Sequence, residues 1–321
     1  MTGGLGVAIP FWLDRPDEEA VEIARTADRA GVQTVWVGEM ASFDAFALAT
    51  AIGLQTERVR LKVGPLAVGV RSPVAIALGL SSVATLVGRA VDAALGASSP
   101  AIVSGWHGRP WSGLAGQMTE SVVALRALLD GERIDPGFKL RRPQPGASIT
   151  VAAFGPRMTR VGARLADEVV LNLVSPAHVA TVRARLDDEA AAAGRPAPAR
   201  LAVWVPAALD PGEGALAQLA SQLAVYLGAP GYGELFAGLG FGDLVDRARA
   251  GMPRAALAEA VPSELLAQIG ALGDAGEILA RVAAYQEAGA DHVAIVPSTA
   301  EDPAGGRLLE AVGQLEATTQ R

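Results

Sequence analysis

The chain has 321 residues, with 27 basic against 34 acidic side chains and a formal net charge of −7. This acidic balance argues against a basic surface that binds nucleic acid. Because the chain contains no cysteine, it can form no disulfide framework, iron–sulfur cluster or cysteine-ligated zinc site. Its three histidines lie far apart in the sequence, so we expect no metal centre.

The N-terminal residues 1–10 lack the basic and apolar regions of a secretion signal. The most apolar window, residues 72–88, has no charged side chain, but it contains a proline. It is also shorter than the roughly 20 apolar residues that a membrane-spanning helix needs. We therefore expect a cytoplasmic protein with neither a membrane nor a nucleic-acid partner.

Short apolar runs alternate with amphipathic stretches along the whole chain. In chain order, the sequence predicts strands at residues 5–9, 33–37, 58–67, 90–95, 149–153, 168–173, 201–206 and 292–296. It predicts helices at residues 17–30, 43–55, 73–86, 117–129, 157–166, 176–193, 213–227, 275–288 and 307–317. Strands that alternate with helices of this length indicate a parallel sheet with helical crossovers.

Eight such units in one chain favour an α/β fold built as a single (β/α)8 TIM barrel, with an open doubly wound sheet as the alternative. Two stretches fit no unit. Residues 131–148 form an excursion, and a glycine-rich insertion at about 229–262 precedes the last βα unit. No low-complexity linker divides the chain, so we expect one domain over residues 1–321.

In a parallel barrel the active site lies in the loops that follow the strands. The loop after the fourth predicted strand consists of Gly96, Ala97, Ser98 and Ser99. Its small side chains let backbone N–H groups converge on an anion, and its two hydroxyls add donors. The loop after the fifth strand consists of Phe154, Gly155, Pro156 and Arg157. It opens a helix whose free N–H groups and positive dipole end favour a phosphate.

Turn formation and helix capping are the ordinary alternatives for both loops. Two side chains are candidates for proton transfer: His107, beside Trp106 in a glycine-flanked loop, and Glu39, just after the second strand. A packing histidine and a loop-capping carboxylate are the alternatives here. The residues alone thus indicate a barrel enzyme that binds a phosphorylated ligand, without a Walker or Rossmann fingerprint.

Several segments resemble the bacterial luciferase-like monooxygenase superfamily, namely residues 24–39, 56–73 and 85–89. Residues 95–108 and 154–169 look like the branch of that superfamily that uses the deazaflavin coenzyme F-420. The similarity covers about residues 4–175 and, less closely, residues 273–297. It implies a flavin-like ring in the barrel mouth, with its phosphate held by the loops after the fourth and fifth strands.

The resemblance also implies a non-proline cis peptide near Leu66 and Ala67, in a bulge that backs the ring. The cofactor-binding residues that it implies, besides the two loops, are Pro65, Leu66, Ala67 and Trp106. The implied function is hydride transfer between coenzyme F-420 and an unidentified organic substrate, with His107 as the first candidate proton source and Glu39 as the second. The alternative is an FMN-dependent two-component monooxygenase.

Two rivals lie outside this chemistry: a flavin-binding protein without activity, and a barrel enzyme acting on phosphate esters. Sugar-phosphate dehydrogenases of the resembled group carry an Asp-His pair after the second strand, whereas this chain has Glu39 and Met40. A sugar phosphate is therefore not the expected small-molecule substrate. Members of the superfamily often pair, so the resemblance implies a homodimer.

Overall fold

The structure, a computed structural model, describes residues 4–12, 14–39, 41–135 and 137–319. It divides into two compact units. The central unit comprises residues 33–171 and 181–202, and the terminal unit comprises the described residues of 1–32, 172–180 and 203–321. Each unit collects pieces that are distant in the chain, and the single domain expected over residues 1–321 stays a prediction.

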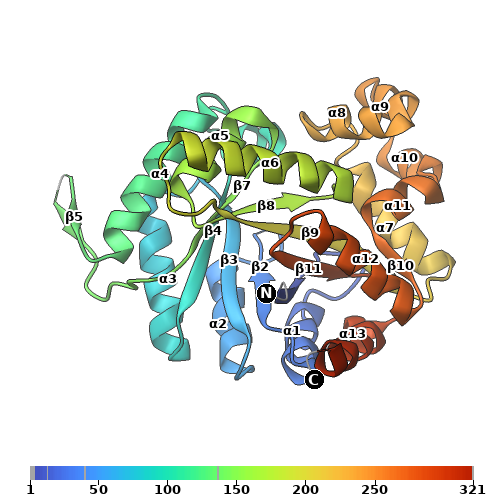
Figure 1. Ribbon diagram of the computed structural model, residues 1–321, viewed down its shortest axis with the longest axis horizontal. Helices are drawn as coiled ribbons and strands as arrows, with labels where there is room; N and C mark the ends of the chain where they lie inside the picture. Colours follow the sequence, from blue (N-terminus) through green and yellow to red (C-terminus); the bar gives the residue numbers. More distant parts are fainter. Residues whose placement is uncertain (1–3, 13, 40, 136, 320–321) are drawn as a thin grey trace. The chain divides into compact units, whose positions relative to one another are not determined.

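The central unit contains strands in the order β2, β3, β4, β7 and β8, and each neighbouring pair is parallel (Figure 1). These strands are β2 (Thr34–Val37), β3 (Arg60–Ala67), β4 (Val91–Gly96), β7 (Ile149–Ala152) and β8 (Glu168–Asn172). The helices that follow them are α2 (Ala45–Leu54), α3 (Pro73–Val87), α4 (Leu114–Leu129), α5 (Gly155–Leu165) and α6 (Pro176–Ala192). A π-helix, η1 (Ala101–Trp106), lies between β4 and α4, and a hairpin of β5 (Arg133–Ile134) and β6 (Phe138–Lys139) follows α4.

The terminal unit contains strands in the order β10, β9, β11 and β1. They are β1 (Gly4–Ala8), β9 (Arg200–Leu209), β10 (Ala271–Gly273) and β11 (His292–Pro297). Its longer helices are α1 (Glu19–Ala30), α7 (Glu213–Ala224), α12 (Ala275–Glu287) and α13 (Gly306–Thr319). Its shorter helices are α8 (Tyr232–Phe236), η2 (Ala237–Phe241), α9 (Gly242–Arg249), α10 (Arg254–Ala260), α11 (Ser263–Ile269) and η3 (Pro303–Gly305).

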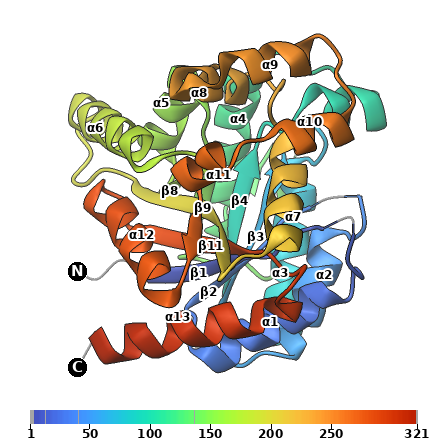
Figure 2. The same ribbon diagram turned by 90° about the vertical axis from the view of Figure 1, so that its right-hand side faces the viewer.

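All eight predicted strands and all nine predicted helices are present, with ends that differ by a few residues. The insertion at about 229–262 is helical: α8, α9 and α10 pack together, and α10 packs on α7 (Figure 2). The sequence did not indicate these helices because each has only five to eight residues, too few for a helical period to stand out.

A buried ion pair joins three strands inside the central unit. Lys62 on β3 donates to Glu168 on β8 at 2.5 Å and to the hydroxyl of Thr150 on β7 at 3.1 Å. The ammonium group also lies 4.4 Å from the ring centroid of Trp36 on β2. All four side chains are buried. Because removing one partner of such a pair leaves an uncompensated buried charge, the pair fixes these strands in their register.

The carboxyl end of β3 is irregular. Its register with β4 shifts between Val63 and Leu66, which confirms the bulge that the resemblance implies. The cis peptide is Gly64–Pro65 and not a non-proline bond near Leu66 and Ala67. The expectation was wrong in position and type, because the bulge has a proline at its centre and proline is the residue at which cis peptides normally occur.

We predict that Gly64→Ala strongly destabilises the protein. Gly64 has a φ of +123°, and an added Cβ would lie 2.1 Å from the carbonyl oxygen of Ala94. The positive φ and the close contact both involve backbone atoms that cannot move aside. We therefore expect the free energy of unfolding, measured by thermal unfolding, to fall by more than about 1–3 kcal/mol. Gly116→Ala is the control, because a Cβ there would meet no atom within 4 Å. Equal melting temperatures for the two variants would contradict this account.

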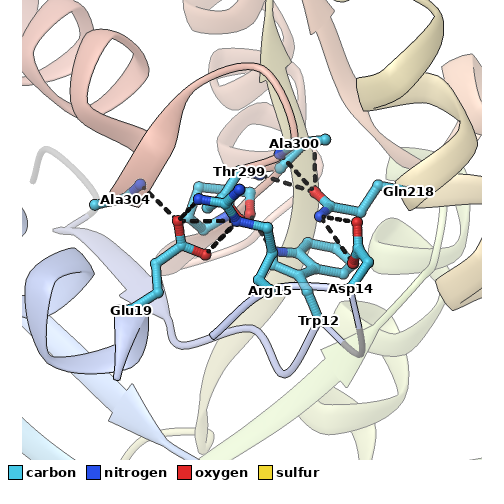
Figure 3. A network of polar contacts seen from close by, with 10 residues as sticks. Trp12, Asp14, Arg15, Glu19, Gln218, Thr299, Ala300 and Ala304 are labelled. Carbon is cyan, nitrogen blue, oxygen red and sulfur yellow. Dashed lines mark hydrogen bonds and ion pairs between the residues drawn. The ribbon is translucent and has the colours of Figure 1, made fainter. Parts of the chain in front are cut away.

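In the terminal unit, hydrogen bonds connect the loop after β1 with the loop after β11 (Figure 3). The indole N–H of Trp12 donates to the carbonyl of Pro297 at 3.0 Å. Gln218 on α7 accepts from the N–H of Thr299 at 2.8 Å and donates to the carboxylate of Asp14 at 3.1 Å. The two loops are therefore held by side chains from elements that are about 200 to 280 residues apart in sequence.

Glu19 on α1 is the charged centre of the same network (Figure 3). It accepts from Arg15 at 2.6 Å, from the hydroxyl of Thr299 at 2.7 Å and from the N–H of Ala304 at 3.1 Å. Burial by itself raises the pKa of Glu19, but these hydrogen bonds outweigh it and hold the pKa below its ordinary value. The carboxylate form is therefore the form that the fold stabilises.

We predict that Glu19→Gln lowers stability at pH 7 by roughly 1–2 kcal/mol, since the carboxylate is only partly screened by solvent. Because the folded-state pKa is depressed, this contribution is complete above the unfolded-state pKa, near 4.5, and is lost as the pH falls through the folded-state value. Urea unfolding of wild type and variant across pH 3–8 measures this contribution to the free energy of unfolding. The difference between wild type and variant should shrink below about pH 4, and a constant difference would refute the assignment. Glu18→Gln, at an exposed position, is the control.

Candidate functional site

Small residues form a continuous surface at the carboxyl ends of β3, β4 and β7. Pro65 and Ala67 lie on the same face of β3 and are half-buried, whereas Leu66 between them is buried. Ala67 pairs with Gly96 on β4. A Cβ on Gly96 would lie 3.0 Å from the Cβ of Pro65 and 3.8 Å from the Cβ of Ala152 on β7. We call Pro65, Ala67, Gly96 and Ala152 the small-residue floor. None of these four residues has a long side chain that would extend over a ligand bound at these strand ends.

The loop after β4 turns sharply away from this floor. Ser98 is exposed and has a left-handed backbone, with a φ of +58°. Its neighbour Ser99 accepts a hydrogen bond from the N–H of Ile102 at 3.4 Å and so begins η1. The indole N–H of Trp111 lies 3.3 Å from the carbonyl oxygens of both Ala97 and Ser98. These carbonyls are thereby occupied, and the hydroxyl of Ser98 is left at the surface.

The two remaining site residues that the sequence predicts after β4 lie at the carboxyl end of the π-helix η1. Trp106 ends η1 and is 58% exposed, a large fraction for the largest side chain. His107 follows it, also exposed, and its backbone N–H bonds to the carbonyl of Ile102 at 3.2 Å. π-helical turns are rare and occur often at functional sites. Both rings are accessible to a ligand, and neither is a packing residue of the core.

The loop after β7 leads directly into α5. Phe154 precedes the helix and is half-buried, while Gly155, Pro156 and Arg157 are exposed. Gly155 has a φ of +75°, and no side chain caps the amino end of α5. For Arg157 we find no side-chain partner among the described residues. The first turn of α5 therefore offers backbone N–H groups and a guanidinium to an anion.

Glu39 lies just after β2, where an arginine holds it. Arg71, which follows β3, donates to both carboxylate oxygens of Glu39, through Nε at 2.8 Å and through Nη2. The N–H of Ala45 lies 3.4 Å from the same carboxylate. Met40, the next residue, lies outside the described residues. These contacts fix the orientation of the Glu39 side chain at the end of β2.

Arg71 also donates to Asp44, and its guanidinium lies 5.2 Å from the ring centroid of Phe46. The hydrogen bond to Glu39, followed by that to Asp44, raises the pKa of Arg71 above its ordinary value, against the effect of burial. Burial raises the pKa of Asp44, but the N–H of Ala47 and the guanidinium of Arg71 leave it lower than usual. The cluster therefore consists of one permanent cation and two carboxylates.

The structure brings most of the predicted positions to neighbouring strand ends. Because β4 pairs in parallel with β7, and β3 with β4, the loops after these strands start side by side. Leu66 is the exception, since its side chain points into the core. Sequence reasoning missed Arg71 and Ala152. Arg71 follows directly on the third predicted strand, which was the available signal, whereas an alanine at the end of a strand carries no signal of its own.

The part of the chain that the structure describes contains neither a metal-binding cluster nor a membrane-spanning helix. No group of three or more histidine, aspartate or glutamate side chains there is placed to hold a metal ion. None of the described helices is both long enough and apolar enough to cross a membrane.

Comparisons with known proteins give relatives that match over nearly the whole chain. A Mycobacterium tuberculosis protein that is named as a coenzyme F-420-dependent oxidoreductase is 24% identical over 333 aligned residues, which cover 92% of this chain and 96% of that one. An F-420-dependent secondary alcohol dehydrogenase, solved with an F-420–acetone adduct, is 18% identical over 98% of each chain, with a TM-score of 0.76. A 3,6-diketocamphane monooxygenase constituent of Pseudomonas putida, solved with FMN, is 17% identical over 97% of each chain, with a TM-score of 0.68.

These structural likenesses concern the fold, and they agree with eight strands that alternate with helices along the chain. The predicted (β/α)8 barrel is confirmed. The family model described as luciferase-like monooxygenase matches residues 10–292, which is most of the sequence. The chain therefore belongs to the luciferase-like monooxygenase family.

Proposed function

We propose that the protein is an oxidoreductase that transfers a hydride between the deazaflavin coenzyme F-420 and a small organic substrate. The observation that carries this proposal is the small-residue floor of Pro65, Ala67, Gly96 and Ala152, next to an uncapped helix end. A Cβ on Gly96 would lie 3.0 Å from the Cβ of Pro65, so a side chain at position 96 would crowd the floor at the place where the ring would lie. The M. tuberculosis relative, named as an F-420-dependent oxidoreductase, supports the choice of cofactor.

In this proposal the residues of the chain bind the phosphate of the cofactor, support one face of its ring and cover the ring. Ser98 and the first turn of α5, with Arg157, bind the phosphate of the cofactor. The floor supports one face of its ring, and Trp106 covers the ring from η1. Coenzyme F-420, when bound, supplies a ring carbon that gives or accepts a hydride. The chain itself contributes orientation, exclusion of water and a proton.

His107 is our first candidate for the proton source. It is exposed and lies directly after Trp106, and an imidazole exchanges protons near neutral pH. Glu39 is the second candidate, and its ion pair with Arg71 bears on that role. Arg71 donates to both of its carboxyl oxygens, so Glu39 is held in one orientation and is less accessible than His107.

An FMN-dependent two-component monooxygenase is the second candidate function. The FMN-bound monooxygenase constituent from P. putida supports it, because its fold matches this chain with a TM-score of 0.68. The floor and the end of α5 suit the ring and phosphate of either cofactor. The two functions differ in whether oxygen reacts at the ring, and this difference can be measured.

We predict that the purified protein binds coenzyme F-420 more tightly than FMN. The measurement is a fluorescence titration with each oxidised cofactor, followed by oxygen-uptake measurements with each reduced one. Arg157→Ala should weaken binding of either phosphorylated cofactor by roughly tenfold or more, the effect of losing one charge-assisted hydrogen bond. Arg141→Ala, which removes an exposed arginine outside the site, is the control. Tighter binding of FMN with oxygen consumption would refute the F-420 assignment in favour of the monooxygenase.

We propose, further, that the protein is a homodimer through an apolar surface on the central unit. Neither α2 nor α3 contains a charged residue, and the two helices pack side by side. Large apolar side chains are exposed on these helices and on α4, namely Leu54, Leu78, Leu86 and Val123. Exposed apolar side chains on adjacent uncharged helices are typical of an interaction surface.

We predict that Leu78→Glu combined with Leu86→Glu makes the protein monomeric, because two carboxylates would be buried without partners. Size-exclusion chromatography with light scattering measures the mass. Val225→Glu, which changes an apolar side chain of similar exposure on the terminal unit, is the control and should leave the dimer intact. A monomeric wild type, or a dimer that survives both substitutions, would exclude this surface.

A further inference from the structure

A cavity that is largely open to solvent lies in the central unit, and it begins beside the small-residue floor, because its lining residue Val68 follows Ala67 and donates its N–H to the carbonyl of Gly96 at 3.1 Å. It has a volume of about 390 Å³, which is within the range of small-molecule sites. One wall is a single face of α4, made by Gln117, Glu120, Ser121 and Ala124. Their spacing of three, four and seven residues places them in one stripe along the helix. The opposite wall comes from the loop after β3 and from the segment after η1.

The cavity carries two opposite charges that do not pair with each other. Arg109 and Glu120 both line it and both are exposed. Among the described residues we find no ion pair for either side chain. Elsewhere in this unit, arginines and carboxylates that lie within reach do pair, as in Arg71 with Glu39. The guanidinium of Arg109 and the carboxylate of Glu120 are therefore free to bind opposite ends of one ligand.

The inner part of the cavity adds two polar side chains, those of Ser121 and Gln117. Ser121 is only 5% exposed, and we find no hydrogen bond of its hydroxyl within the described chain. A ligand or a water molecule can therefore bind this hydroxyl. Gln117 donates through Nε2 to the carbonyl of Ser112 at 2.9 Å. Its Oε1 points toward Gly69, where an added Cβ would lie 3.6 Å away.

The rest of the lining is apolar, from Val68, Pro73, Pro110 and Ala124. A matching ligand has a carboxylate for Arg109, an ammonium group for Glu120 and an apolar side chain for these four residues. We propose that this cavity binds a small zwitterion of that kind, such as an apolar α-amino acid. The proposal goes beyond the redox function above and does not depend on it, because none of the cofactor-binding residues lines this cavity.

Three probes that share the leucine side chain separate the charges: L-leucine, N-acetyl-L-leucine without the ammonium group, and L-leucinamide without the carboxylate. Calorimetric titration of the full chain, without added cofactor, measures their affinities. We expect L-leucine to bind at least about tenfold more tightly than either analogue, since each analogue loses one charge-assisted contact.

Two variants then assign each charge to its partner. Arg109→Met should weaken L-leucine and N-acetyl-L-leucine by about tenfold and leave L-leucinamide unchanged. Glu120→Gln should weaken L-leucine and L-leucinamide and leave N-acetyl-L-leucine unchanged. The matched controls are Arg141→Met and Glu132→Gln, which change exposed charges outside the cavity. Since all four positions are exposed, we expect every variant to fold.

The proposal is overturned by any of three results. The first is that L-leucine does not bind up to its solubility limit. The second is that the three probes bind with equal affinity. The third is that Arg109→Met or Glu120→Gln affects all three probes alike, or no more than its control does. Cofactor binding, measured separately with F-420 and FMN, is not affected by any of these outcomes.

Discussion

The close approach of β3 to β4 is the constraint on which the candidate site depends. At Gly64 the backbone of β3 comes so near to the carbonyl of Ala94 that no side chain fits between them. The bulge that results lets Pro65 and Ala67 face the same side while Leu66 anchors the strand in the core. Because Gly96 adds no side chain on β4, the surface continues to β7. The grouping of small residues at three strand ends is thus a consequence of backbone contact.

Charge is distributed around this platform in two different ways. Inside the central unit, Lys62 and Glu168 neutralise each other in a fully buried pair that also involves Thr150. At the strand ends, Arg71 balances Glu39 and Asp44, but all three remain partly exposed to solvent. Interior charges of the first kind hold strands together, whereas those of the second kind can still interact with a bound molecule. The two cases differ in how deeply the charged groups are buried, because solvent near the surface lowers the free-energy cost of an incompletely paired charge.

The sequence was sufficient for the fold and only partly sufficient for the site. The nine predicted helices have ten or more residues, so their apolar periods are long enough to distinguish, and the strands are recognisable as short apolar runs between them. The helices of the insertion were not, and neither was η1, since a six-residue π-helix has no periodic signature. Loops after β4 and β7 could be named as neighbours from barrel topology alone. That Arg71 would hold Glu39 depended on the length of the loop after β3, which sequence patterns do not report.

The π-helix η1 makes the directions of two side chains sensitive to a single deletion. A π-helical turn holds one residue more than an α-helical turn, and each residue in an α-helix advances the side-chain direction by about 100°. Deleting one residue from Ala101–Trp106 would therefore restore α-helical spacing. The side chains of Trp106 and His107 would then both point in a different direction. The barrel strands would be untouched, since the change lies wholly between β4 and α4. Such a change would move two exposed side chains beside the small-residue floor and leave the strands that form the floor as they are.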